Sequence, residues 1–275
     1  MKYRLDFFVI LHPHFSNHLV MTQRAKKLID SMIAARDDAQ RDILMRFFKT
    51  GEGEYGYGDE FLGLKNPQTR AFVKANKDFD LEDIKCLVDN KFHEIRLCGF
   101  LILVEKYAKL QSAKLLHDIN SMAERDSIID FYVTNSTKAN NWDIVDLTAP
   151  KLLGCWIVEK TIVELPDKED VIERLSHSDN LWQKRMSMVF TYTTSRHNMP
   201  EYAIRYADFH LADTHDLMHK AVGWMLRELG KCCGLDTLRE FLNDHINVMP
   251  RTTLRYAIEK MDEQERNYWM KKDCK

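Results

Sequence analysis

The sequence is poor in the residues that make tight turns. Its 275 residues include only 10 glycines and 6 prolines, whereas 45% are hydrophobic. Such a composition leaves few places for hairpins and favours helices. A chain of this length can bury a substantial core, either as one large domain or as two small ones. The expected fold class is therefore all-α.

Paired cysteines, long apolar runs and an excess of positive charge are also missing. The six cysteines form no C-x-x-C pair and no zinc spacing. A disulfide framework, a structural metal and a cofactor are therefore not expected, and a reduced, cytoplasmic protein fits best. No apolar run approaches the roughly 20 residues that cross a bilayer, so no membrane association is expected. Because the formal charge is −2, a polyanionic partner requires a local basic surface.

Residues 1–20 precede the first helical pattern. Their apolar stretch, residues 5–11, contains Asp6 and is not followed by a small-residue cleavage site, so it is a poor signal peptide. An amphipathic pattern begins after Met21. We expect residues 1–20 to be an N-terminal extension outside the fold and residues 21–275 to be a single helical-repeat domain.

Apolar residues recur at three- and four-residue spacing through most of the chain, which indicates amphipathic helices. Two helices are expected between residues 22 and 49, broken around residues 36–40. Pairs of helices with short polar breaks follow Pro67, and short loops place paired helices antiparallel. The predicted pairs are 81–88 with 93–107, 127–134 with 142–159, 168–175 with 181–194, 200–209 with 217–229, and 235–242 with 252–261.

The second helices of these pairs show a repeat. Lys220 follows Arg185 by 35 residues, and Arg255 follows Lys220 by 35 residues. A period of this size is typical of HEAT-like helical solenoids, in which equivalent positions share one concave surface. A concave basic face is therefore predicted, with chance alignment of exposed basic residues as the alternative. Its members are Arg96, Arg185, Lys220, Arg227, Arg251 and Arg255.

Residues 51–63 hold five of the ten glycines. A glycine-rich loop can bind phosphate, but this segment lacks the Lys-Ser/Thr that ends a P-loop. Four acidic residues in it would also repel an anion: Glu52, Glu54, Asp59 and Glu60. We therefore predict a structural loop.

The segment Asn-Asn-Trp-Asp-Ile-Val-Asp, residues 140–146, places Trp142 and Asp146 four residues apart. On a helix this spacing puts both side chains on one face, one turn apart. A carboxylate beside an aromatic ring suits a cationic, flat or sugar-like group. The alternative is a half-buried packing role for Trp142 and a first-turn acid at Asp146, favoured by the helix dipole.

Two more tryptophans, Trp182 and Trp224, lie near the start or the middle of later second helices. Their neighbours in the sequence are basic: Lys184 and Arg185 near Trp182, and Arg227 near Trp224. Interleaved basic and aromatic groups suit a nucleic-acid backbone, because cations contact phosphates and rings contact planar or sugar-like groups.

Six segments, taken together and in this order, resemble the AlkD-like DNA alkylation repair family. This family consists of DNA glycosylases built from HEAT-like repeats, and the resemblance covers roughly residues 30–261. The segments are Tyr-Gly-Asp-Glu-Phe-Leu-Gly-Leu (57–64), His-Glu-Ile-Arg (93–96), Asn-Trp-Asp-Ile-Val-Asp (141–146), Asp-Asn-Leu-Trp-Gln-Lys-Arg (179–185), His-Lys-Ala-Val-Gly-Trp-Met-Leu-Arg-Glu (219–228) and Arg-Thr-Thr-Leu-Arg-Tyr-Ala-Ile-Glu (251–259).

The resemblance implies excision of N3- and N7-alkylated purines from double-stranded DNA in base excision repair. The family's catalytic residues match Trp142, Asp146 and Arg185, and Phe47 falls where the family can have a tyrosine. We expect a monomer without cofactor or metal that associates with the nucleoid when bound to DNA. The predicted DNA-contacting residues are Phe47, Trp182, Lys184, Lys220, Trp224, Arg227, Arg251 and Arg255.

The chemistry of such a site can be stated for each catalytic position. Asp146 is expected to stabilise the oxocarbenium ion that forms on the deoxyribose, Trp142 to pack against the sugar, and Arg185 to contact a flanking phosphate. Two alternatives keep the fold without this chemistry. One is a noncatalytic helical-repeat scaffold that binds DNA or RNA, and the other is a protein-binding solenoid.

Overall fold

The computed structural model describes residues 21–162 and 169–272, and this part of the chain is all-α. The predicted extension, residues 1–20, and the predicted helix start at Lys168 lie outside the described residues. The helices are α1 (Gln23–Ala34), α2 (Asp38–Phe47), α3 (Asn66–Ala75), α4 (Leu81–Val88), α5 (His93–Leu110), α6 (Ile119–Thr134), α7 (Trp142–Thr148), α8 (Cys155–Ile162), α9 (Glu169–Ser176), α10 (Leu181–Val189), α11 (Thr191–Arg196), α12 (Pro200–His210), α13 (Asp216–Cys233), α14 (Leu235–His245), α15 (Arg251–Ala257) and α16 (Glu263–Lys271).

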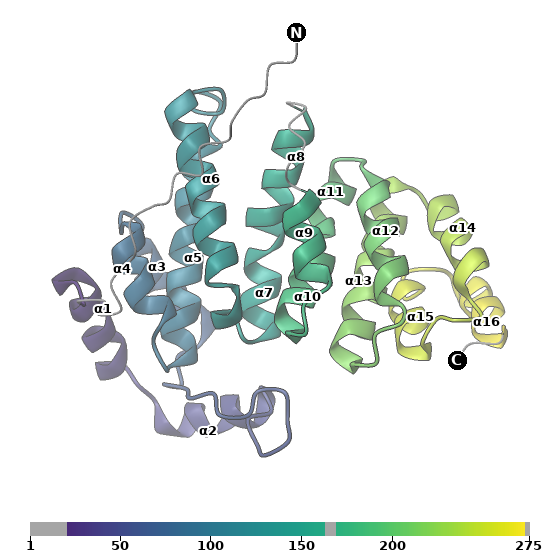
Figure 1. The fold of residues 1–275 in the computed structure, drawn as a ribbon. Coiled ribbons are helices and arrows are strands. Elements are labelled where there is room, and N and C mark those ends of the chain that lie inside the picture. Colours follow the sequence, from purple (N-terminus) through teal and green to yellow (C-terminus); the bar gives the residue numbers. More distant parts are fainter. Residues whose placement is uncertain (1–20, 163–168, 273–275) are drawn as a thin grey trace, which may run out of the picture.

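From α3 to α16 the helices follow one another in space in the order of the chain, from blue through green to yellow in Figure 1. Consecutive second helices are in contact: α5 with α7, α7 with α10, α10 with α13, and α13 with α15. The α2 helix lies apart from this row. Its C-terminal end reaches the start of α5 and α7, because the Phe48 ring lies 5.1 Å from His93 and 5.4 Å from Trp142, centroid to centroid.

The core is formed where long helices are covered by their neighbours. The α5 helix is buried along most of its length and packs against α3, α4, α6 and α7. The α13 helix packs in the same way against α10, α11, α12, α14 and α15. Both helices were predicted from the apolar spacing of the sequence, as residues 93–107 and 217–229.

Two helices that the periodicity predicts to be continuous are divided. The predicted helix 142–159 consists of α7, a π-helical segment (Pro150–Gly154) and α8. Pro150 has no N–H to donate to the turn before it, and a wider turn accommodates that loss. The predicted helix 181–194 is divided at Phe190 into α10 and α11. The two breaks meet, since a Cβ on Gly154 would lie 2.6 Å from the Phe190 carbonyl oxygen.

Two other boundaries were misplaced. The α6 helix begins at Ile119 rather than at residue 127, because the Asp118 carboxylate caps it by accepting from the Ser121 N–H at 2.8 Å. The α15 helix ends at Ala257 rather than at residue 261. Both predictions relied on the spacing of apolar residues alone, which carries no information about the polar groups that cap helix ends.

The glycine-rich loop, residues 51–63, is held at its C-terminal end by α5. The buried Glu94 carboxylate accepts hydrogen bonds from the backbone N–H groups of Leu62, Gly63 and Leu64 at 2.8 to 3.1 Å. Gly63 has a φ of +89°, and a Cβ there would lie 2.0 Å from the Asp37 carbonyl oxygen. Only glycine fits this left-handed conformation beside α2.

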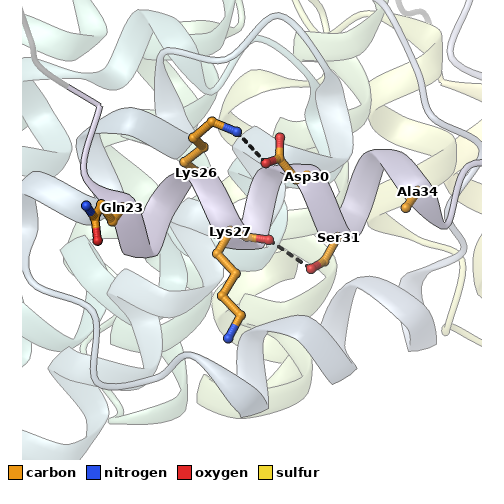
Figure 2. A pocket seen from close by; sticks show the side chains of 6 residues that line it. All are labelled: Gln23, Lys26, Lys27, Asp30, Ser31 and Ala34. Atoms are coloured by element: carbon orange, nitrogen blue, oxygen red, sulfur yellow. Dashed lines mark hydrogen bonds and ion pairs between the residues drawn. The ribbon is translucent and has the colours of Figure 1, made fainter.

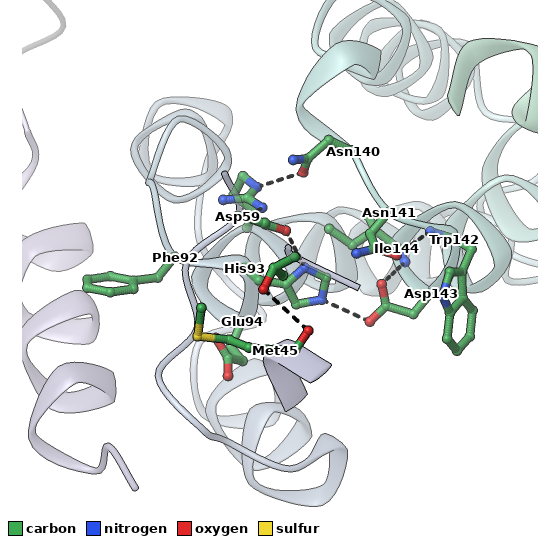
Figure 3. Close-up of polar contacts among 12 residues, drawn as sticks. Met45, Asp59, Phe92, His93, Glu94, Asn140, Asn141, Trp142, Asp143 and Ile144 are labelled. Carbon is green, nitrogen blue, oxygen red and sulfur yellow. Dashed lines mark hydrogen bonds and ion pairs between the residues drawn. The ribbon is translucent and has the colours of Figure 1, made fainter. Parts of the chain in front are cut away.

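A buried ionic network joins the same loop to the start of α7 (Figure 3). The His93 ring lies between two carboxylates, with Nδ1 3.2 Å from Asp59 and Nε2 2.9 Å from Asp143. The Arg96 guanidinium also donates to Asp59. Burial alone would lower the pKa of His93, but the two carboxylates raise the pKa to about 9. The histidine is therefore a cation at neutral pH, and two positive charges balance two negative ones.

The raised pKa of His93 predicts how stability depends on pH. A group whose pKa is higher in the folded state contributes stability that is complete below its unfolded pKa, near 6.5, and is lost as pH rises toward the folded value of about 9. The free energy of unfolding, measured by urea denaturation between about pH 6.5 and pH 8.5, is expected to fall. Since one proton is involved, the unfolding constant changes by at most about tenfold per pH unit.

The His93→Gln variant should be less stable and lose this slope, whereas His117→Gln, at an exposed position, should keep it. A wild-type unfolding free energy that is constant or rises over the range would contradict the ionic role of His93.

Candidate active site

Asp146 in α7 and Arg185 in α10 form an ion pair between the two helices. Arg185 Nε donates to Asp146 Oδ1 at 2.8 Å, and Arg185 Nη2 donates to Asp146 Oδ2 at 2.8 Å. Two parallel hydrogen bonds fix the plane of the carboxylate against the plane of the guanidinium. Trp142 lies one turn before Asp146 in the same helix. The structure thus brings together the three residues predicted to be catalytic.

Arg185 faces inward. Its side chain is only 6% exposed, and its third donor, Nη1, bonds to the Leu217 carbonyl oxygen of α13 at 2.6 Å. The predicted contact between Arg185 and a flanking phosphate does not match this placement, because the protein itself uses these donors. The arginine instead connects α7, α10 and α13.

The Asp146 carboxylate is mostly covered but still reachable, with 16% of its side chain exposed. Burial raises the pKa of Asp146, and the nearby Asp143 carboxylate acts in the same direction. The Arg185 guanidinium opposes both effects and favours the ionised form. The result is a carboxylate in a poorly solvated position, held in one orientation, where its field on a neighbouring charge is stronger than in bulk water.

Trp142 belongs to an aromatic cluster at the C-terminal end of α2. Its half-buried ring lies 5.4 Å from Phe48 and 5.9 Å from Phe47, centroid to centroid. Phe48 is buried, whereas Phe47 is 60% exposed. The predicted DNA-contacting position Phe47 therefore presents an open ring beside the tryptophan of the site.

Tyr55, from the glycine-rich loop, completes the cluster. Trp142 Nε1 donates to the Tyr55 hydroxyl at 3.2 Å, and the Tyr55 ring packs edge-on against Trp182 with centroids 6.0 Å apart. The prediction of a structural loop did not include this residue. Helical periodicity carries no information about a loop side chain, and the only signal in the sequence was a tyrosine placed among glycines.

The two other tryptophans of the predicted surface differ in exposure. Trp182 is 6% exposed and belongs to the hydrophobic core, where it meets the Tyr55 ring edge-on, so its predicted contact with DNA does not match this placement. Trp224 in α13 is half-buried and lies 6.0 Å from the Tyr192 ring. Of these two side chains, Trp224 offers the larger surface to a ligand.

The predicted cationic contacts are largely paired with acids. The pairs are Lys184 with Asp213 at 3.3 Å, Lys220 with Asp216 at 2.7 Å, and Arg227 with Glu259. Arg251 and Arg255 in α15 are exposed. Asp216 also raises the pKa of Lys220, which keeps this amine charged. A polyanion at this surface would exchange carboxylate partners for phosphates.

Arg96 does not belong to a surface stripe. It is 5% exposed and donates to Asp59 and to the backbone carbonyls of Asn90 and Lys91. The predicted six-residue basic surface therefore loses Arg96 and Arg185 to the interior. The 35-residue spacing links Arg185 with Lys220 and Arg255, yet Arg185 is buried and Arg255 is exposed, so spacing alone does not separate buried from exposed basic residues.

The rest of the described chain shows no second candidate for an active site. No group of three His, Cys, Asp or Glu side chains in residues 21–162 and 169–272 could hold a metal ion. No helix in the same residues is long and apolar enough to cross a membrane. A shallow hollow over α1, shown in Figure 2, is lined by side chains of that single helix, where Lys26 pairs with Asp30 at 2.6 Å. It lies on a different element from the ion pair of α7 and α10.

Comparisons with known proteins agree with this fold. A solved structure described as a predicted DNA alkylation repair enzyme from Enterococcus faecalis is similar, with a TM-score of 0.60 over 83% of this chain and 97% of that chain. Their sequences are 15% identical, so this likeness concerns the fold. No curated protein matches the chain. The model of the family described as DNA alkylation repair enzyme matches residues 28–261, and the chain therefore belongs to that family.

Proposed function

We propose that the protein is a DNA glycosylase that hydrolyses the N-glycosidic bond of N3- and N7-alkylated purines in double-stranded DNA. The observation that carries the proposal is the Asp146 carboxylate, fixed by Arg185, partly exposed and one turn from Trp142. A fixed negative charge at a reachable position suits a reaction whose transition state is a cation.

The reaction needs no protonation of the leaving group. Alkylation at N3 or N7 makes the purine cationic, so the electron pair of the C1′–N bond returns to the ring and a neutral base departs. Positive charge then develops on C1′ and the ring oxygen of the deoxyribose. Asp146 stabilises this charge more than it stabilises the ground state. A water molecule adds to C1′ and loses a proton, which leaves an abasic sugar.

The three residues Trp142, Asp146 and Arg185 have distinct roles in this proposal. Trp142 packs against the sugar, and its ring face favours the oxocarbenium ion. Arg185 orients the carboxylate and keeps it ionised, in place of the phosphate contact expected from the sequence. Asp146 alone faces the charge that develops during the reaction.

The surrounding helices provide the DNA surface in this proposal. The row of helix pairs is a HEAT-like solenoid, and its second helices line a concave basic face. Its support is the contact between consecutive second helices, which carry the tryptophans and the accessible basic residues. The proposed contacts are Phe47, Lys184, Lys220, Trp224, Arg227, Arg251 and Arg255.

Substitution of Asp146 tests the chemistry. The Asp146→Asn variant is expected to release 7-methylguanine from duplex DNA about a hundredfold more slowly than the wild type, because it removes one preplaced charge. Asparagine still accepts a hydrogen bond from Arg185, and thermal unfolding followed by circular dichroism checks that the fold is kept. Asp30→Asn on α1 is the matched control. Equal base release by Asp146→Asn and the wild type would remove Asp146 from catalysis.

The raised pKa of Asp146 predicts how the rate of base release depends on pH. Because the ionised carboxylate is the active form, the rate of base release is expected to fall as pH decreases through a pKa above the usual 3.8 of aspartate. The profile is measured under single-turnover conditions, after subtracting spontaneous release without enzyme. The rate of the Asp146→Asn variant should not show this decrease at low pH. A decrease of the same size in the variant would mean that another group titrates.

The salt dependence of binding tests the cationic surface. Each phosphate contact adds about 0.9 to the slope of log affinity against log salt concentration for duplex DNA. Lys220→Gln is expected to reduce that slope by about this amount, measured by fluorescence anisotropy. Lys27→Gln on α1 should leave the slope unchanged, and an equal effect of both variants would contradict the proposed surface. A noncatalytic scaffold would show the same binding without release of base.

A further inference from the structure

Tyr55 in the glycine-rich loop takes no part in the proposed reaction. Its segment is separated from α7 by most of the N-terminal half of the chain, yet its hydroxyl accepts the Trp142 indole N–H at 3.2 Å. The indole has no other polar atom, so this bond is its one directional contact. The phenyl rings of Phe47 and Phe48 pack on Trp142 but cannot fix its rotation by hydrogen bonding.

The Tyr55 side chain bridges the first turns of two helices. Its hydroxyl binds Trp142 in α7, and its ring meets Trp182 in α10 at 73°, with centroids 6.0 Å apart. These helices also carry Asp146 and Arg185, respectively. Tyr55 therefore connects the same two helices as the ion pair. It does so at their first turns, where the two tryptophans lie.

Backbone and side-chain contacts fix the position of the loop next to Tyr55. The Gly56 N–H bonds to the Lys49 carbonyl at 3.0 Å, and a Cβ on Gly56 would lie 2.4 Å from the Phe48 carbonyl oxygen. Four residues after Tyr55, Asp59 is anchored by His93 and Arg96. Because the residue directly after Tyr55 is fixed against Lys49 and Phe48, the tyrosine is preorganised, and its contact with Trp142 costs little additional conformational entropy.

We propose that Tyr55 is a positioning residue of the α7 and α10 site, which holds the Trp142 indole in the orientation that receives the substrate sugar. The inference rests on the proposed glycosylase function. It assigns a role in the site to the glycine-rich loop, through a hydrogen bond to a residue that contacts the substrate.

A purely structural role for Tyr55 makes a different prediction. If the tyrosine only fills space between Trp142 and Trp182, then Tyr55→Phe keeps the ring and changes nothing but the hydroxyl. Its loss would then have no effect on the rate of base release at fixed saturation with DNA. The hydroxyl alone therefore separates the two roles.

The experiment is a double-mutant cycle on the full chain with duplex DNA that contains 7-methylguanine. Tyr55→Phe is expected to lower the single-turnover rate about three- to tenfold, the equivalent of one ordinary hydrogen bond. The dissociation constant for the DNA should stay within about twofold. In the Trp142→Phe background the same substitution should have almost no effect, because phenylalanine has no N–H to position.

Two further measurements complete the design. The fluorescence of Trp142, obtained by subtracting the spectrum of Trp142→Phe, should shift in Tyr55→Phe. Tyr57→Phe is the matched control, since this tyrosine of the same loop is 68% exposed, and it should change neither the rate nor the spectrum.

The inference is overturned if Tyr55→Phe matches the wild type in rate and spectrum, or if it slows both backgrounds equally. A wild type that releases no base defeats the proposed function itself, and that outcome is recognised before any variant is compared.

Discussion

The ion pair of Asp146 and Arg185 is the interaction on which the arrangement of the site depends. It joins two helices, and the third donor of the arginine reaches a carbonyl of α13. Removing one partner from such a buried pair leaves an uncompensated charge, which is far more costly than losing a surface ion pair. The pair therefore constrains the helix positions, while the remaining exposure of the carboxylate leaves it available to a ligand.

A second group of charges controls how the N-terminal segment meets these helices. His93 and Arg96 balance Asp59 and Asp143 in the interior, and this network links the glycine-rich loop to the first turn of α7. The acidic residue Asp59 is thus used inside the protein rather than facing solvent. The C-terminal end of the loop is held by Glu94 and by the Asp59 network, and the loop also delivers Tyr55 to the aromatic cluster.

Much of the fold could be predicted from the chain because its signals are local. Apolar spacing identified three helix pairs that pack together, α4 with α5, α9 with α10, and α12 with α13, whereas α6 packs mainly on α5 and α14 on α13 rather than on their predicted partners. The four-residue spacing of Trp142 and Asp146 placed them one turn apart, as α7 confirms. The family was recognised over residues 30–261, close to the matched residues 28–261. The errors arose where residues outside the apolar pattern set a helix boundary. Pro150 interrupts one predicted helix, and Asp118 extends another by capping it.

The sequence by itself determined the all-α class, the family and the three residues that meet in the site, because periodicity and motifs depend on neighbours along the chain. Only the tertiary structure decided which basic residues are accessible, since Arg96 and Arg185 are buried by partners far away in sequence. It also decided that Tyr55 reaches Trp142. Burial and pairing depend on how distant segments pack, and linear spacing does not encode that information directly.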